Sequence, residues 1–132
     1  MKSLLIDTNV LISLFRGDEN IAAEIGAYDR ILVPTVVIGE FKAGINAAVK
    51  AGKAQQRQLD EFLDSAAVSV IPVSEDVSDA YARIFRVLKA NGTPIPQNDM
   101  WIAACAVETG ATLYSKDAHF SLIPLLKVIV AG

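Results

Sequence analysis

Apolar and polar positions divide this chain into short apolar runs separated by longer amphipathic stretches. The first run, Leu4–Ile6, has no polar face, which is typical of a strand buried on both sides. Similar runs lie at 30–33, 68–73, 111–114 and 127–130. The run at 68–73 contains a proline, which favours an edge position. Strands that alternate with helices predict a parallel sheet covered on both faces, and therefore an α/β fold.

The stretches between these runs have the apolar spacing of helices. Ser74 precedes two acids, as at a helix start, and Asn91-Gly92 is a natural helix end. We expect Thr35 to cap a long helix that ends near Gly52, and Asn98 to cap the last, nearly all-apolar helix. The predicted helices span 10–15, 19–27, 35–52, 53–66, 75–91 and 100–109.

Small residues keep the predicted helix at 35–52 thin, and a polar helix at 53–66 is expected to pair with it. The pair exposes an apolar stripe that a monomer would leave partly uncovered, which predicts a homodimer that also binds a small partner chain.

Composition limits the possible classes of protein. A chain of 132 residues is expected to form one domain, 1–132. No apolar stretch approaches the roughly 20 residues of a membrane helix, and an acid at position 7 argues against a signal peptide. Cys105 is the only cysteine, which excludes an internal disulfide and a thiolate metal site. We therefore expect a cytoplasmic protein.

Four acids occupy unusual positions. Asp7 ends the first strand and Asp117 follows the fourth, Asp99 opens the last helix, and Glu40 lies in apolar surroundings. Each acid also has an ordinary interpretation: a helix cap for Asp7, a first-turn acid for Asp99, a turn acid for Asp117 and the edge of an apolar stripe for Glu40. An acid near the core needs a cation or a hydrogen-bond donor, so we expect one beside Glu40.

Topology favours convergence of these acids. Asp7 and Asp117 leave the carboxyl ends of strands, where open α/β sheets bind ligands, and the helix start at Asp99 opens at the same edge. Carboxylates about 5 Å apart repel each other by roughly 3 kcal/mol at an effective dielectric near 20. Without a cation, at least one of the four should have a raised pKa. Oxygen ligands favour Mg²⁺ or Mn²⁺, and such metals serve phosphate-ester chemistry.

Net charge leaves a nucleic-acid partner possible. The chain has 12 basic and 15 acidic residues, a balance of −3. Without the four acids, 11 acidic residues remain against 12 basic ones, so the rest of the surface does not repel a polyanion.

Four segments of the chain carry a recognisable pattern: Leu4–Ile12, Gly39–Gly44, Asn98–Ala104 and Ser115–Phe120. Together they resemble the PIN domain, and more narrowly the VapC-type toxins of prokaryotic toxin–antitoxin pairs. The resemblance covers essentially the whole chain. It implies a three-layer α/β/α sandwich with a central parallel sheet of four to five strands.

The resemblance also implies a function. It suggests an endoribonuclease that hydrolyses RNA with a metal-activated water and is paired with an antitoxin protein. The implied metal ligands and catalytic residues are Asp7, Glu40, Asp99 and Asp117, with Mg²⁺ as cofactor and Mn²⁺ as a substitute. Asn9 and Ser115 carry over as supporting polar groups, although the family often has Thr at the latter position.

One departure concerns His119, because some relatives have a further acid near this position. We interpret this histidine as a surface or RNA-facing residue, and Trp101 and Cys105 as core residues. Basic residues at 42–57 and 83–89 are either RNA contacts or a solvated face, the latter including an Asp79–Arg83 helical pair.

Two other functions compete. A catalytically silent PIN-like module that binds RNA or protein needs no converging acids. A phosphotransfer domain would form an aspartyl phosphate, but the first strand ends in Asp7-Thr8-Asn9 and lacks the neighbouring acid that such sites use.

Overall fold

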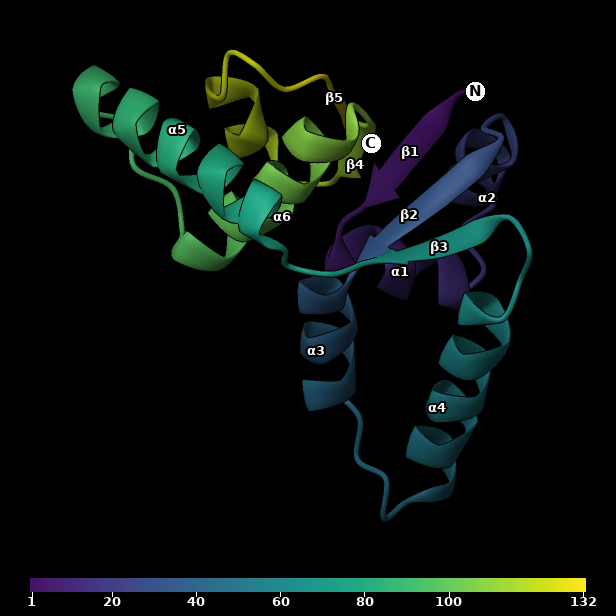
Figure 1. Cartoon of the computed structure of the whole chain (residues 1–132). Coiled ribbons are helices and arrows are strands. Elements are labelled where there is room, and N and C mark those ends of the chain that lie inside the picture. The colour runs from purple at the N-terminus through teal and green to yellow at the C-terminus, as the bar shows by residue number, and fades with distance from the viewer.

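The computed structural model describes residues 1–132 and has one parallel sheet of five strands in the order β3-β2-β1-β4-β5, flanked by six helices (Figure 1). The predicted parallel α/β architecture is therefore confirmed. The strands are β1 (Ser3–Ile6), β2 (Arg30–Pro34), β3 (Val68–Ile71), β4 (Thr112–Ser115) and β5 (Val128–Val130). The helices are α1 (Thr8–Phe15), α2 (Glu19–Gly26), α3 (Thr35–Ala43), α4 (Lys50–Leu63), α5 (Glu75–Asn91) and α6 (Gln97–Thr109), with a 3₁₀ turn, η1, at Ala118–Leu122.

Strand β1 lies at the centre of the sheet, with β2 on one side and β4 on the other. Leu5 pairs with Leu32 of β2 and with Leu113 of β4. The strand order reverses between β1 and β4, so the carboxyl ends of these two strands form the topological switch point. Strand β3 lies at an edge, as the proline in the run 68–73 predicted, and Pro72 directly follows the strand.

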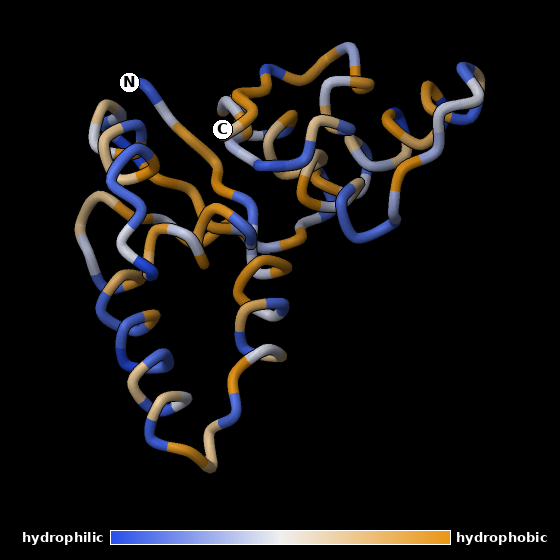
Figure 2. The backbone as a smooth tube through the Cα atoms, turned by 180° about the vertical axis from the view of Figure 1, so that it is seen from behind, coloured by the Kyte–Doolittle hydropathy of each residue, from blue (hydrophilic) through white to orange (hydrophobic).

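The core surrounds β1 and α6. Leu4, Leu5 and Ile6 have no exposed surface, and neither has Phe120 of η1. Residues 102–106 of α6 are all buried, which confirms the buried helix expected from its composition. Hydrophobic residues predominate along the strands and hydrophilic ones along α4 (Figure 2). No helix has both the length and the apolar character needed to cross a lipid bilayer.

The predicted long helix at 35–52 is wrong, because the chain forms two helices, α3 and α4, joined at 44–49. Asn46 Oδ1 accepts a hydrogen bond from the backbone N–H of Ala48 at 3.1 Å, and such local bonds compete with helix formation. Gly52 does not end a helix but lies inside α4. An added Cβ at Gly52 would lie 1.7 Å from the Asn46 carbonyl oxygen, so the connection requires glycine there.

Helix boundaries follow the predictions only in part. Ser74 caps α5 by accepting a hydrogen bond from the Val77 N–H at 3.2 Å, and Gly92 ends α5 with a φ of 66°. The predicted caps Thr35 and Asn98 are wrong, because the positions before α3 and α6 are taken by prolines that make no side-chain cap bond. Proline has a φ already fixed near the value that these positions need.

The Gly52 contact makes a testable prediction. Gly52→Ala should lower the free energy of unfolding by about 1–3 kcal/mol, because the connection at 44–49 must move to admit the methyl group. Chemical denaturation measures the effect. Gly39→Ala is the matched control: it lies in α3 with no atom within 4 Å of the added Cβ, and should raise stability by about 0.5–1 kcal/mol. Equal stability changes in the two variants would contradict the close approach.

Candidate functional site

The switch point gathers polar side chains around the buried carboxylate of Asp7. This residue follows β1 directly and is only 4% exposed. Its Oδ2 accepts a hydrogen bond from the Ser115 hydroxyl at 2.7 Å, and its Oδ1 accepts one from the Thr8 N–H at 2.7 Å. Asp7 therefore caps α1, as its ordinary interpretation held, and also lies within the predicted site.

Ser115 and Asn9 join Asp7 to Asp117. The Ser115 hydroxyl, which has no exposed surface, accepts a hydrogen bond from the Asp117 N–H at 3.0 Å. Asn9 Oδ1 accepts from the Lys116 N–H at 3.1 Å, and its Nδ2 makes longer contacts of 3.5 Å with Ser115 Oγ and Asp117 Oδ2. The two residues predicted as supporting polar groups thus connect the ends of β1 and β4.

Glu40 of α3 is exposed, so the prediction that it lies near the core is wrong. The reason is that Val37 and Phe41 form the buried face of α3, and Glu40 lies on its exposed face. The expected donor is present, because the Thr8 hydroxyl donates to Glu40 Oε1 at 2.8 Å. This bond connects Glu40 to Thr8, the residue that follows Asp7.

Asp99 lies in the first turn of α6 and has a partner that the sequence interpretation missed. Its Oδ2 lies 2.9 Å from Nε2 of His119 in η1. One donor atom each from Asp99, Asp117 and His119 lie within 4.8 Å of one another. The sequence feature that could have identified His119 is its position two residues after Asp117, where some members of the family that the chain resembles have an acid.

Two of the acids have a raised pKa, as the sequence predicted for at least one. Burial is the largest cause of the raised pKa of Asp7, and hydrogen bonds from Ser115 and Thr8 oppose it. Negative charge on Asp99 and Glu40 raises the pKa of Asp7 further. Burial also raises the pKa of Asp99, with His119 opposing the shift and Asp117 adding to it. Loss of solvent therefore contributes more than the charge repulsion that was expected.

The donor set fits a divalent cation. Four carboxylates, one of them buried, lie at one edge of the sheet, where Asp7 is bonded to Ser115, Glu40 is bonded to Thr8, and the acids raise one another's pKa. Oxygen ligands of this kind suit Mg²⁺ and Mn²⁺. No lysine or arginine lies within ion-pair distance of any acid in the structure; the only contact of this kind joins Asp99 and the imidazole of His119. The expected Asp79–Arg83 pair is therefore not formed.

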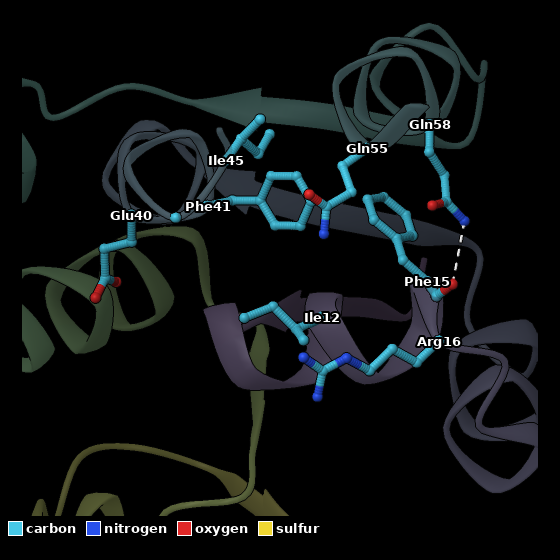
Figure 3. A pocket seen from close by; sticks show the side chains of 9 residues that line it. Ile12, Phe15, Arg16, Glu40, Phe41, Ile45, Gln55 and Gln58 are labelled. Carbon is cyan, nitrogen blue, oxygen red and sulfur yellow. Dashed lines mark hydrogen bonds between the residues drawn. The ribbon is translucent and has the colours of Figure 1, made fainter. Parts of the chain in front are cut away.

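A pocket of about 220 Å³ adjoins the site, between α1 and the pair α3–α4 (Figure 3). The ring of Phe15 packs edge-to-face against Phe41, with 5.4 Å between ring centroids, and against Phe62, with 5.6 Å. The carbonyl oxygen of Phe15 accepts a hydrogen bond from Gln58 Nε2 at 3.3 Å. Glu40 lines the pocket as well as the site. The other lining residues are Ile12, Phe15, Arg16, Phe41, Gly44, Ile45, Gln55 and Gln58.

Comparisons with known proteins agree on one family. The family model described as PIN domain matches residues 4–125. The chain is 29% identical to Ribonuclease VapC4 of Mycobacterium tuberculosis, over 98% of this chain and 97% of that protein.

Solved structures show the same fold. VapBC2 from Rickettsia felis, bound to a DNA fragment from its promoter, superposes with a TM-score of 0.85 at 22% identity and covers 98% of this chain and 99% of its own. VapBC-5 from M. tuberculosis, a member of the VapBC family of toxin–antitoxin systems, superposes with a TM-score of 0.76 at 25% identity. The match covers 99% of this chain and 100% of that chain.

The raised pKa values predict how stability without metal depends on pH. The folded state holds the protons of Asp7 and Asp99 more tightly than the unfolded chain, in which the ordinary value is 3.8. The penalty is absent below that value and grows as the pH rises through the folded pKa. In EDTA, the free energy of unfolding should therefore fall as the pH rises from about 4 toward neutrality.

Asp7→Asn should flatten this decline, and denaturant titrations across the pH range measure it. Glu108→Gln, an exposed acid at the other end of α6, is the control and should keep the wild-type slope. A slope unchanged by Asp7→Asn would show that this carboxyl group does not contribute to the decline.

Proposed function

Because the chain belongs to the PIN domain family, we propose that it is a metal-dependent endoribonuclease of the VapC type, the toxin of a toxin–antitoxin pair. One observation supports the proposal: at the β1–β4 switch point, Asp99 and Glu40 raise the pKa of Asp7, and Asp117 raises that of Asp99, so the four acids share one electrostatic environment. A structural role alone needs at most one of these acids as a helix cap. The proposed catalytic unit is a single PIN domain, 1–132.

In the proposed site, these four acids hold a divalent cation, Mg²⁺ with Mn²⁺ as a substitute. A bound Mg²⁺ supplies Lewis acidity, which polarises a phosphoryl oxygen and makes a water molecule in its coordination shell more acidic. The net negative charge of the four acids favours a cation over an anion. The carboxylates alone would repel the phosphates of RNA, so we propose that RNA binds only when a cation offsets their charge.

The supporting residues fix where the carboxylates point. Ser115 and Thr8 each hold one oxygen of Asp7, so its plane is defined before any ligand binds. Asn9 contacts Asp117 and anchors the backbone at Lys116, which keeps the end of β4 against α1. This preorganisation places charge at the site without a rearrangement during the reaction.

The cleavage assay tests the proposal directly. Purified protein should cut RNA in Mg²⁺ or Mn²⁺ and not in EDTA. Asp7→Asn and Asp99→Asn should each lower the rate by at least about 100-fold, because even outer-shell partners of a metal contribute 10–100-fold. Circular dichroism should show that both variants remain folded, since the substitution removes a charge but little volume.

Glu108→Gln is the matched control and should cleave at the wild-type rate. Undiminished cleavage in chelator, or in both aspartate variants, contradicts the metal-dependent mechanism. RNA binding without cleavage would instead favour the silent binding module.

The pocket between α1 and α3–α4 is the proposed antitoxin site. Four apolar residues of its mixed lining, Ile12, Phe15, Phe41 and Ile45, suit an apolar side chain of a partner, and Glu40 connects the pocket to the acids. A chain seated there would lie beside the centre.

We also propose a homodimer, although the exposed apolar surface lies elsewhere than predicted. Of the large, well-exposed apolar residues, only Val49 belongs to 35–66; the others are Met1, Val70, Val73, Phe85, Leu122, Leu125 and Val130.

A charge in the pocket tests the antitoxin site. Ile45→Asp should abolish co-purification with the small protein encoded by the neighbouring gene, because the carboxylate would have to be desolvated on binding. RNA cleavage should continue. Val49→Asp is the control, because it adds the same charge at an exposed position outside the pocket. Retained co-purification of Ile45→Asp would place the antitoxin elsewhere.

A further inference from the structure

His119 supplies the only imidazole among the acids of the site. Its Nε2 lies 2.9 Å from Asp99 Oδ2, and this pair forms a cluster with Asp117 in which the donor atoms lie within 4.8 Å of one another. The chain contains no other histidine. His119 is therefore the one residue that could offer an imidazole nitrogen to a metal at this site.

The backbone turn fixes His119 next to Asp117. Asp117 precedes η1 and His119 is the second residue of that turn, so both side chains leave the same short segment. The imidazole ring lies against the ring of Phe120, with 4.8 Å between centroids, and Phe120 has no exposed surface. A buried neighbour thus helps to hold the imidazole beside the acids, whereas a free surface histidine would have no such restraint.

The observed spacing suits ligands of one ion. Two adjacent ligands of an octahedral ion with bonds of about 2.1 Å lie about 3.0 Å apart, and opposite ligands about 4.2 Å apart. The 2.9 Å between His119 Nε2 and Asp99 Oδ2 is near the distance between adjacent ligands, whereas the 4.8 Å that bounds the whole cluster is longer than the distance between opposite ligands. The alternative is that His119 only donates a hydrogen bond that positions Asp99 and is not itself a ligand.

We propose that His119 is itself a ligand of the divalent cation, through Nε2 and beside Asp99 and Asp117, and that it shifts the preference of the centre from Mg²⁺ toward Mn²⁺. The inference rests on the metal site of the proposed function. An imidazole ligand favours first-row transition ions, whereas Mg²⁺ favours oxygen ligands. Exchanging one oxygen ligand for nitrogen therefore strengthens Mn²⁺ binding more than Mg²⁺ binding.

Mn²⁺ reports on its own ligands by electron paramagnetic resonance. Electron spin echo envelope modulation of the Mn²⁺-loaded wild-type protein should show the nitrogen of a directly bound imidazole, and His119→Gln should lose that signal. Dissociation constants for Mn²⁺ and Mg²⁺ come from calorimetry on the same samples. The ratio of the Mg²⁺ to the Mn²⁺ constant should be at least about 10-fold larger in wild type than in His119→Gln.

Glutamine separates the two roles of His119, because its amide still donates a hydrogen bond to Asp99 but offers only oxygen to a metal. Ser121→Ala, an exposed position in the same turn, is the control and should keep both the nitrogen signal and the wild-type ratio.

Two results overturn the inference, and they are distinguishable. Mn²⁺ binding without a nitrogen signal in wild type, together with an unchanged ratio in His119→Gln, makes His119 a positioning residue and leaves the proposed metal site intact. Failure of wild type to bind either ion removes the proposed metal site as well. The wild-type spectrum decides the ligand question even if His119→Gln does not fold.

Discussion

The hydrogen bond from the Ser115 hydroxyl to the Asp7 carboxylate is the interaction on which the site depends. The two residues are 108 positions apart in the chain, so the bond forms only when β1 and β4 lie side by side. A carboxylate that is 4% exposed loses most of its hydration and needs such donors to remain charged. The apolar strand β1 buries Asp7, and the end of β4 provides the compensation. Packing and chemistry are therefore coupled at one contact.

That coupling carries an electrostatic cost. Burial is the main cause of the raised pKa values of Asp7 and Asp99, and neighbouring acids add to it. A fold selected for stability alone would replace these groups with apolar residues or pair them with lysine or arginine, yet no such pair is present. The arrangement is understandable if a cation offsets the charge, because ligand binding to the folded state then returns the lost free energy.

Much of this arrangement was predictable from the sequence, because its signals are local. Unbroken apolar runs identify buried strands, and acids directly after them fall at the edge of a parallel sheet. The failures concern contacts distant in sequence. The break at 44–49 depends on Gly52 approaching the backbone of Asn46, and helical composition does not report it. His119 belongs to the site only because η1 turns back toward the start of α6. The exposure of Glu40 depends on which face of α3 packs on the core, and Val37 and Phe41 form that face.

Glu40 joins the candidate site to the neighbouring pocket, and this suggests why the pocket lies where it does. Its carboxylate accepts a hydrogen bond from Thr8, whose backbone N–H is bonded to Asp7, and it also lines the pocket between α1 and α3–α4. A group bound in the pocket would lie against Glu40, which is one of the charges that raise the pKa of Asp7. The pocket and the centre therefore share one exposed, charged residue.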